Sequence, residues 1–382
     1  MNEDKREFAY WMALAHLPKM RNYRKNELIA IMVEEKINIM DFFHLEKSHY
    51  KSIFSLSADE ILLIEESKKE LPNLSFIVED LLEQGYEIIP ITSKEYSPVM
   101  KKNMKMRYSP PLIYTKGNKQ IMKEKSIAIV GSRKAAKISL EFTDNIAKAA
   151  SKNFEVVVSG FAKGVDKQAL DSAIKYKGQS IIVLPQGITT FRSGFKKYYK
   201  QIIEGDVLVL STFHPNAPWS VQLAMARNPV IYGLARDIYV AESSDKGGTW
   251  SGVNDGLKKG RTIYVRIPGE KEKNANKKLI QKGAVPVDIN GKPAEDYSDQ
   301  QLKIDVVSEQ EIPFNELEPK IVKLLSTGNF SSKDIIKKLN LNLDKRKLTD
   351  FLKHNRKFKV INKTPLQFTL NEKSKSQQNL FE

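Results

Sequence analysis

The sequence contains no cysteine among its 382 residues. This absence excludes disulfide bonds, thiolate catalysis and zinc sites built on cysteine, and it suits a protein of the cytoplasm. Histidine is scarce as well. The five histidines show no metal-ligand spacing apart from His44 and His49, which we interpret as surface residues. We therefore expect no bound metal.

Long hydrophobic runs are also missing. No apolar segment approaches the roughly 20 residues that a membrane-spanning helix needs. The short apolar stretch from Phe8 to Leu17 follows three acidic residues, which is unlike a signal peptide. The sequence predicts a cytoplasmic protein without a membrane partner.

Recognisable catalytic machinery is a third absence. No nucleophile triad is visible, and residues 131–137 lack the Gly-Lys-Ser/Thr ending that a P-loop nucleotidase requires. We expect no ATP hydrolysis, no other enzymatic activity and no cofactor.

Positive charge, in contrast, is abundant. The chain carries 62 Lys and Arg against 46 Asp and Glu, a formal net charge of +16, and half of this excess lies in residues 315–382. One interpretation is a solvated lysine-rich surface. The other is a nucleic-acid partner, because clustered Lys and Arg bind phosphates.

The pattern of apolar residues divides the chain into four parts. Residues 1–80 have helical spacing and predict a helical domain. In residues 81–300, short apolar runs alternate with helical segments, which is typical of a mostly parallel sheet covered on both faces. Residues 305–371 predict three helices and a β-hairpin, a winged helix whose basic third helix contacts either DNA or protein. Residues 372–382 are polar and predict a disordered tail.

Two glycine turns in the second part carry the strongest local signal. One apolar run ends in Gly131-Ser132-Arg133, and the next ends in the turn from Ser159 to Gly164. A buried parallel strand that ends in glycine at a helix start exposes backbone N–H groups to an anion. Arg133 and Lys163 add positive charge at the two turns. The pair predicts an α/β fold with an extended Rossmann-like domain that binds phosphate.

The order and spacing of these turns and of several shorter elements resemble the DprA/Smf family of DNA-processing proteins. The resemblance covers about residues 96–287, and its elements include Tyr96-Ser97-Pro98, Pro110 to Tyr114, Val130 to Arg133, Ser159 to Asp166, Arg227-Asn228, Glu242 with Gly247 to Thr249, and Ile267-Pro268-Gly269. It implies a Rossmann-like domain with a helical, SAM-like N-terminal domain and a C-terminal winged helix. It also implies a homodimer that binds and protects single-stranded DNA and loads the recombinase RecA in recombination or transformation.

The resemblance and the residue chemistry together indicate which residues bind DNA. Arg133 is the main candidate for a phosphate clamp, because its planar guanidinium grips two oxygens. Lys196 and Lys197 lie where the family carries a DNA-contacting lysine, with aromatics for base stacking at Phe195, Tyr198 and Tyr199, although we expect Tyr198 or Tyr199 in the core. The predicted contacts are Gly131, Ser132, Arg133, Ser159, Gly160, Lys163, Gly164, Arg192, Lys196, Lys197, Lys200, Arg227, Asn228, Gly247, Gly248 and Thr249.

The chain departs from the family pattern at the predicted DNA-binding edge. Pro229 stands where the family has the second arginine of its Arg-Asn-Arg motif, and Leu170 stands where it has a histidine. The fold is expected to survive these changes, because none removes a strand. Two alternatives to DNA binding stay open: a nucleotide-binding or nucleotide-hydrolysing protein of the lysine-decarboxylase-like group, which Gly247-Gly248-Thr249 resembles in part, and a winged-helix regulator that senses a nucleotide.

The last six residues suggest one further partner. Gln377, Leu380 and Phe381 resemble the Gln-x-x-Leu-Phe peptide by which bacterial DNA enzymes bind the sliding clamp. Two adjacent large apolar residues in a polar segment favour a partner pocket. The alternative is that the tail folds back onto its own winged helix.

Overall fold

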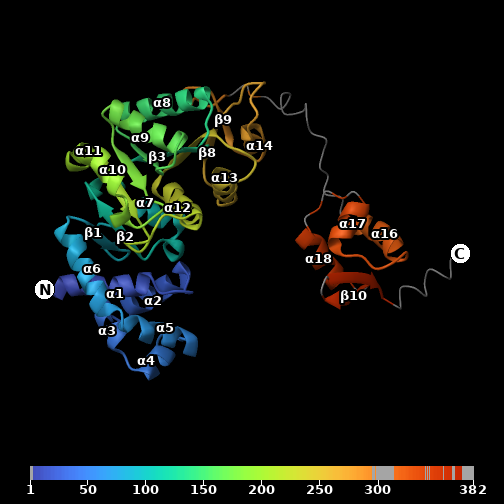
Figure 1. Cartoon of the computed structure of the whole chain (residues 1–382), viewed down its shortest axis with the longest axis horizontal. Coiled ribbons are helices and arrows are strands. Elements are labelled where there is room, and N and C mark those ends of the chain that lie inside the picture. Colours follow the sequence, from blue (N-terminus) through green and yellow to red (C-terminus); the bar gives the residue numbers. More distant parts are fainter. Residues whose placement is uncertain are drawn as a thin grey trace. The chain divides into compact units, whose positions relative to one another are not determined.

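The computed structural model of the chain describes residues 3–294, 297, 314–339, 341, 343, 345–355, 357–363 and 366–371. The chain forms two compact units, Met1–Tyr297 and Ser298–Glu382, and each is described by itself (Figure 1).

A nine-stranded sheet forms the centre of the first unit. Its strand order is β1-β2-β6-β5-β4-β3-β7-β8-β9. The seven strands from β6 to β9 in this order run parallel, while β2 pairs antiparallel with both β1 and β6. The strands are β1 Glu87–Pro90, β2 Leu112–Lys116, β3 Ser126–Gly131, β4 Val156–Ser159, β5 Ser180–Val183, β6 Val207–Ser211, β7 Asp237–Glu242, β8 Ile263–Arg266 and β9 Val285–Val287. The mostly parallel sheet predicted from the short apolar runs is therefore confirmed.

Helices cover both faces of this sheet. Successive residues of a strand point to opposite faces, so a strand that is apolar throughout packs against helices on both sides. On β3, Ile127 and Ile129 join an apolar cluster with residues of α8 Lys137–Lys152 and α9 Val165–Lys175. Ala128 and Val130 belong to the main core on the other face, together with residues of α7 Pro98–Met104 and α12 Val221–Leu234. The remaining helices of the sheet region are η1 Met106–Tyr108, η2 Lys119–Lys123, η3 Ile188–Thr190, α10 Arg192–Lys197, α11 Tyr199–Ile203, α13 Gly248–Lys258 and α14 Asn276–Gln281.

The strand order reverses between β3 and β7. From β3 the chain proceeds to β4, β5 and β6 on one side, and it then returns to place β7, β8 and β9 on the other side. In open parallel sheets, ligands bind at the carboxyl ends of the strands at such a reversal point. The two strand ends, Gly131 and Glu242, lie side by side there in paired register.

Six helices precede the sheet, and α1 contacts β2: α1 Glu3–Ala15, α2 Asn22–Glu34, α3 Ile39–His44, α4 Lys47–Ser52, α5 Ala58–Lys68 and α6 Leu71–Glu83. Ser57 caps α5 in a capping box with Glu60. Buried polar groups link these helices to the sheet region. The Asn26 amide donates to the main-chain oxygens of Met106, Arg107 and Ser109, and the His16 ring meets the Tyr114 hydroxyl at 2.7 Å. The boundary near residue 80 between two separate domains stays a prediction.

The second unit contains α16 Phe314–Leu325, α17 Ser332–Lys338 and α18 Lys345–His354, followed by the antiparallel strands β10 Phe358–Lys363 and β11 Leu366–Leu370. Leu317, Ile321, Leu348 and Phe368 are among the residues of its apolar core. Three helices and a hairpin occur in the predicted order, and the winged-helix interpretation stays a prediction. The sliding-clamp residues Gln377, Leu380 and Phe381 lie outside the described residues.

Candidate nucleic-acid interface

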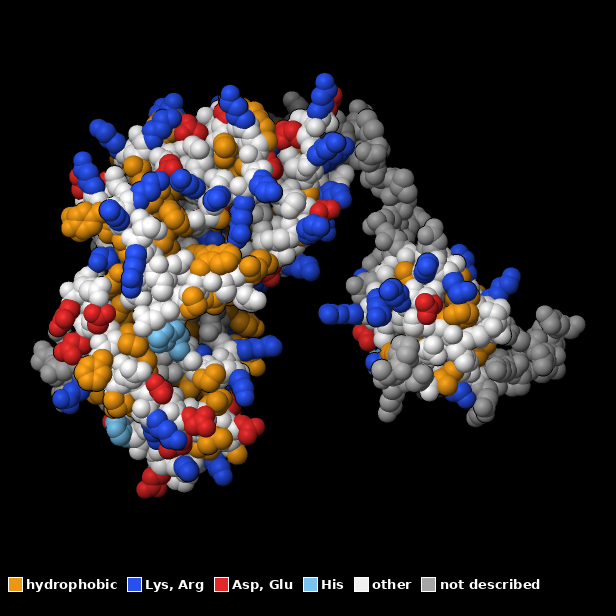
Figure 2. All heavy atoms as spheres, in the orientation of Figure 1, with side chains coloured by type: hydrophobic (Ala, Val, Ile, Leu, Met, Phe, Trp, Pro, Cys, Tyr) orange, Lys and Arg blue, Asp and Glu red, His pale blue; other side chains and the backbone are white. Residues whose placement is uncertain are grey.

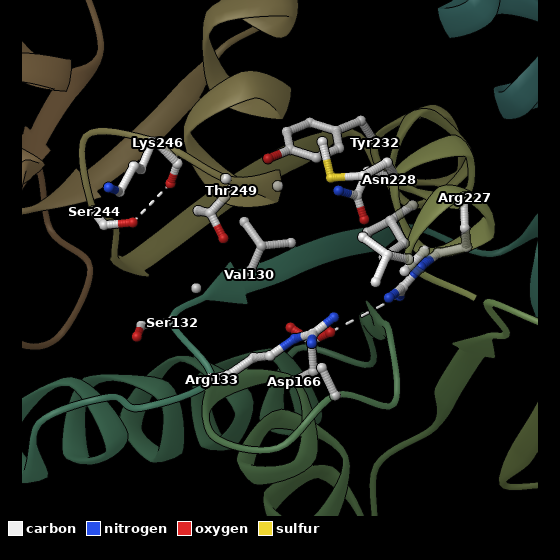
Figure 3. A pocket seen from close by; sticks show the side chains of 18 residues that line it. Val130, Ser132, Arg133, Asp166, Arg227, Asn228, Tyr232, Ser244, Lys246 and Thr249 are labelled. Carbon is white, nitrogen blue, oxygen red and sulfur yellow. Dashed lines mark hydrogen bonds and ion pairs between the residues drawn. The ribbon is translucent and has the colours of Figure 1, made fainter. Parts of the chain in front are cut away.

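A cavity of about 360 Å³ opens at the point where the strand order reverses (Figure 3). Its floor is the end of β3 with the turn that follows, and its walls come from α12, from the start of α9, from the loop after β7 and from the start of α13. Its lining residues include Arg133, Asp166, Arg227, Asn228, Tyr232 and Thr249.

Arg227 and Asp166 form a buried ion pair in the wall of this cavity. The Arg227 side chain is only 4% exposed, and its Nη1 lies 3.8 Å from Asp166 Oδ2. Neither Nε nor Nη1 of Arg227 has a hydrogen-bond partner. Because buried donors are almost always paired in folded proteins, these two N–H groups leave the Arg227 guanidinium incompletely satisfied by the protein itself.

Gly160 makes room for this ion pair. A Cβ at this position would lie 1.8 Å from Arg227 Nη1 and 2.3 Å from Asp166 Oδ2. Any other residue would displace the guanidinium, so the second glycine turn is needed for the close approach of a side chain from α12. Ser159, one residue earlier, is buried, and its hydroxyl donates to the Ile129 carbonyl at 2.6 Å. This contact ties the end of β4 to β3, and the predicted DNA contact of Ser159 stays a prediction.

The electrostatics of the cavity favour an anion. Burial raises the pKa of the Asp166 carboxyl, an effect that the charge of Arg227 and a backbone hydrogen bond from Ala162 oppose. Burial likewise lowers the pKa of Arg227, against the attraction of Asp166. Arg133, which is exposed on its turn, extends its guanidinium toward Asp166 (Figure 3). Two guanidinium groups thus face one carboxylate, which leaves the site with a positive excess.

Three glycine turns lie at this edge, one after β3, one after β4 and a third at Gly247 after β7. They differ in whether a carboxylate of the protein accepts hydrogen bonds from their N–H groups. Glu242 accepts a hydrogen bond from the Ala136 N–H at 2.9 Å in the first turn, and Asp166 takes the Ala162 N–H in the second. At the third turn, α13 starts after Gly247 with no side-chain cap and no acidic residue in its first turn. Its N-terminal N–H groups and helix dipole are therefore open to a phosphate from the cavity.

Other polar groups of α12 converge on the third turn. The Asn228 amide nitrogen would be 2.9 Å from a Cβ at Gly248, and the buried Tyr232 hydroxyl, without a hydrogen-bond partner, also lines the cavity. The predicted residues Arg133, Arg227, Asn228, Gly247, Gly248 and Thr249 are thus brought together.

A second hollow of about 510 Å³ continues from the first cavity. The two share Arg133, Ala162, Ala224 and Arg227 in their walls. The second hollow adds the cations Lys134 and Lys163 and the aromatic rings of Phe161, Phe191 and Trp219. Trp219 is 50% exposed, so its indole face is available for stacking. Cations therefore line both hollows, which we call the track: the Arg227–Asp166 ion pair lies at one end and aromatic surface at the other.

The basic side chains of segment 192–200 lie beside this track: Arg192, Lys196, Lys197 and Lys200 line neither hollow, although the Tyr198 ring packs against Phe161 of the second hollow at 5.9 Å between centroids. Lys197 pairs with Asp171 at 3.6 Å, and Lys200 pairs with Glu204 at 3.8 Å. Their role in DNA binding stays a prediction. Figure 2 shows Lys and Arg side chains crowded over the sheet part of the first unit, on the face drawn.

The aromatic residues of this segment divide as the sequence indicates. Tyr198 is buried and donates from its hydroxyl to Asp171, whereas Tyr199 is 64% exposed. Phe195 packs against Tyr86 and Phe191. Tyr199 alone of the three is therefore free to stack on a base.

Sequence reasoning did not select several residues of the track. Asp166 was visible as the end of the Gly164-Val165-Asp166 element, but its partner Arg227 comes from a distant helix. Trp219 and Phe161 carried no signal, because isolated aromatics outside a periodic element do not reveal which surface they line.

Comparison with known proteins agrees with this geometry. A family model described as DNA recombination-mediator protein A matches residues 87–297, which is more than half of the chain. The chain belongs to this family. The match spans the sheet and all three glycine turns.

Curated relatives carry related names. The chain is 32% identical over 161 residues to the DNA processing protein DprA of Streptococcus pneumoniae, covering 42% of this chain and 56% of that protein. It is 29% identical over 222 residues to DprA of Bacillus subtilis, covering 56% of this chain and 72% of that protein. The chain thus spans only about half to three quarters of these two relatives.

The solved structure of DprA from Streptococcus pneumoniae has the same fold. It aligns with a TM-score of 0.58 and 23% identity, covering 73% of this chain and 93% of that chain. Within the described residues, no helix is long and apolar enough to cross a membrane, and no cluster of acidic or histidine side chains could hold a metal ion.

Proposed function

We propose that this protein binds single-stranded DNA with little sequence preference and acts as a recombination mediator. The observation that carries the proposal is the pair of unpartnered N–H donors on the buried Arg227, placed where a phosphate cavity joins an aromatic hollow. The family's description as a recombination mediator and the relatives' name, DNA processing protein, support it.

The two hollows suit the two parts of a nucleotide. A backbone phosphate between Arg133 and Arg227 would receive charge-assisted hydrogen bonds and the open N-terminus of α13. Bases on the other side would stack on Trp219 or Phe161, and stacking is tolerant of sequence because every base has a π-face. Such an interaction needs unstacked bases, so single strands should bind more tightly than duplex.

The direct test is fluorescence anisotropy with a labelled oligo(dT), with duplex DNA and mononucleotides as competitors. For single strands, log K should fall with log salt by about 0.7 per phosphate contacted, so roughly four to six contacts give a slope of about −3 to −4. A flat salt response or tighter duplex binding would refute the proposal. Stronger competition by a mononucleotide than by the oligonucleotide would favour the nucleotide-binding alternative.

The family resemblance extends the proposal to protein partners. The bound single strand would be protected and handed to RecA, without chemistry on the DNA, by a homodimer of this chain. DNA-stimulated ATP hydrolysis by RecA measures the hand-over, and we expect this protein to shorten its lag. Sedimentation velocity measures the homodimer directly, and a single monomeric species at micromolar concentration would contradict it.

The sliding clamp is a further proposed partner, through residues 377–382. A peptide of residues 373–382 should bind the clamp with an affinity of about micromolar, because ordering a free segment consumes part of the interaction energy. The matched control is the same peptide with Leu380→Ala and Phe381→Ala. Equal binding by the two peptides would dispose of this partner.

A further inference from the structure

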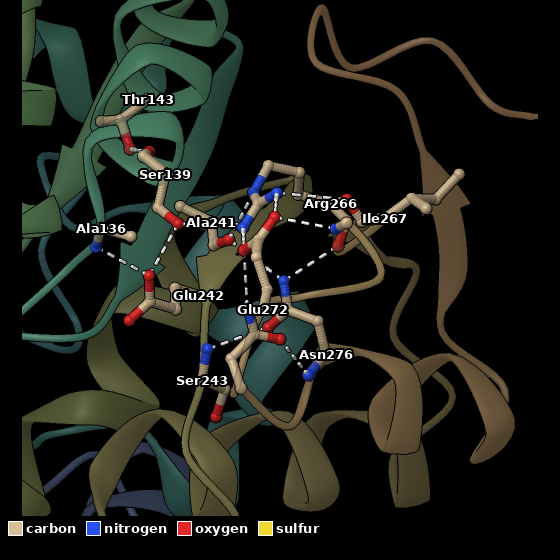
Figure 4. A network of polar contacts seen from close by, with 12 residues as sticks. Ala136, Ser139, Thr143, Ala241, Glu242, Ser243, Arg266, Ile267, Glu272 and Asn276 are labelled. Carbon is tan, nitrogen blue, oxygen red and sulfur yellow. Dashed lines mark hydrogen bonds and ion pairs between the residues drawn. The ribbon is translucent and has the colours of Figure 1, made fainter. Parts of the chain in front are cut away.

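Glu242 fills the position at the first glycine turn where a Rossmann-like fold holds a phosphate. It is the last residue of β7 and lies beside Gly131. Its Oε2 accepts from the Ala136 N–H at 2.9 Å and from the Ser139 hydroxyl at 2.8 Å, at the N-terminus of the 16-residue helix α8 (Figure 4). Its main-chain oxygen accepts from the Ser132 N–H at 2.9 Å. Glu242 therefore accepts hydrogen bonds both from an N–H of the turn and from an N–H at the start of α8.

A buried network holds the Glu242 carboxylate in this place. Arg266, which is 2% exposed, donates from Nη2 to the Ser139 hydroxyl at 3.0 Å. The same guanidinium contacts both carboxylate oxygens of Glu272 and the Ala241 carbonyl (Figure 4). Because Glu272 balances the charge of Arg266, the negative charge of Glu242 is left to face the turn.

An anion that approached this turn would meet an occupied site. In dinucleotide-binding sheets, the pyrophosphate lies at the N-terminus of the helix after the first glycine turn, where it receives backbone N–H groups and the helix dipole. Here the carboxylate already uses the helix dipole, and it would repel a phosphate at short range. The turn after β7 has no such carboxylate in its first helical turn.

We propose that Glu242 is a specificity-determining residue that excludes nucleoside diphosphates and dinucleotides from the first turn and directs phosphate to Arg227 and the start of α13. The exclusion depends on Glu242 alone, whereas the DNA phosphate at Arg227 rests on the function proposed above. Removing the side chain should therefore create a phosphate site that the wild-type protein lacks.

Isothermal titration of the full chain with inorganic pyrophosphate tests this. Glu242→Ala should bind one more pyrophosphate per chain than the wild type. At the first turn, the variant should bind pyrophosphate about tenfold more tightly than the wild type does. Glu242→Gln keeps an acceptor for both hydrogen bonds but removes the negative charge, so it should gain pyrophosphate at this turn more weakly than Glu242→Ala. Glu155→Ala removes a carboxylate that pairs with Arg236, remote from the glycine turns, and controls for net charge.

An unchanged stoichiometry in folded Glu242→Ala would overturn the proposal, as would an equal gain in Glu155→Ala. If Glu242→Ala does not fold, Glu242→Ser serves in its place, because its shorter side chain cannot reach Ala136. Oligo(dT) binding, measured on the same samples, separates the two proposals. Its absence in the wild type would refute DNA binding and leave the pyrophosphate result standing.

Discussion

At the scale of single residues, the exposed Arg133 and the buried Arg227 differ in what they contribute. Arg133 stands on a turn and can swing toward a ligand, while Arg227 is fixed by burial and by Asp166. A fixed guanidinium loses little freedom when it binds, so it selects geometry, whereas an exposed one mainly adds attraction. In the proposed complex with DNA, the two groups would therefore act on different properties.

Replacing Arg133 with alanine should weaken oligo(dT) binding by about tenfold, because one charge-assisted contact is lost while the core is untouched. The melting temperature should stay at the wild-type value, since the side chain is exposed. Anisotropy and thermal unfolding check both statements, with Lys152→Ala, at the far end of α8, as the matched loss of charge. Equal affinity in the two variants would place the DNA elsewhere.

The raised pKa of Asp166 predicts a pH dependence of stability. A carboxyl whose pKa is higher in the folded state binds its proton more tightly there, so the free energy of unfolding falls as pH rises from the usual Asp value, about 3.9, through the raised folded value. Asp166→Asn cannot titrate and should lack this part of the slope. Denaturant unfolding of both proteins across that pH range measures it, and parallel curves would contradict the assignment.

Sequence alone could identify Arg133 but not the ion pair behind it. Arg133 follows a glycine at the end of an apolar run, which is a local pattern. The contact between Arg227 and Asp166 depends on how α12 crosses the second turn, and no local pattern encodes that crossing. The sequence shows Glu242 only as part of a motif. Its place beside the first glycine turn follows from the pairing of β3 with β7, which the sequence does not reveal.

At the scale of elements, three similar strand–turn–helix units end at the same edge and are used differently. Internal carboxylates occupy the first and second turns, and the third is open. Apolar runs were sufficient to predict the strands, because buried parallel strands are continuously hydrophobic. They could not show that β2 joins the sheet antiparallel, since strand direction follows from connections and not from composition.

The second turn gives the sharpest prediction at this scale. Gly160→Ala should weaken oligo(dT) binding by more than tenfold, because the added Cβ would lie 1.8 Å from Arg227 Nη1 and must displace it. Gly269→Ala is the matched control, since its Cβ would make only an ordinary contact of 3.4 Å with Glu272. Anisotropy with both variants measures the difference, and wild-type affinity in Gly160→Ala would show that Arg227 is not part of the DNA site.

At the scale of the whole molecule, the candidate site lies within the first unit, while half of the charge excess lies in residues 315–382. All the residues that line the two hollows belong to the first unit. The long-range attraction of the second unit can still raise the rate of encounter with DNA, an effect that salt screens.

Reversing charge on α18 separates these contributions. Lys345→Glu with Lys353→Glu should leave oligo(dT) affinity within about threefold of the wild type at 0.15 M salt, because screening leaves only short-range contacts. The same variant should lose duplex binding if the basic helix enters a groove. Anisotropy with both DNA forms tests this, and a large loss of single-strand affinity would move the main site to the second unit.

The two edges of the nine-stranded sheet bear on how copies of the protein can assemble. The edge strands are β1, with four residues ending in Pro90, and β9, with three residues centred on Pro286. Proline has no N–H to donate, and the outer side of β9 is already bridged by Pro293. Both edges are therefore poor templates for another chain's strand, which counts against edge-to-edge aggregation. The homodimer proposed above would then be built from side chains on the covering helices or loops, where single substitutions can tune its strength.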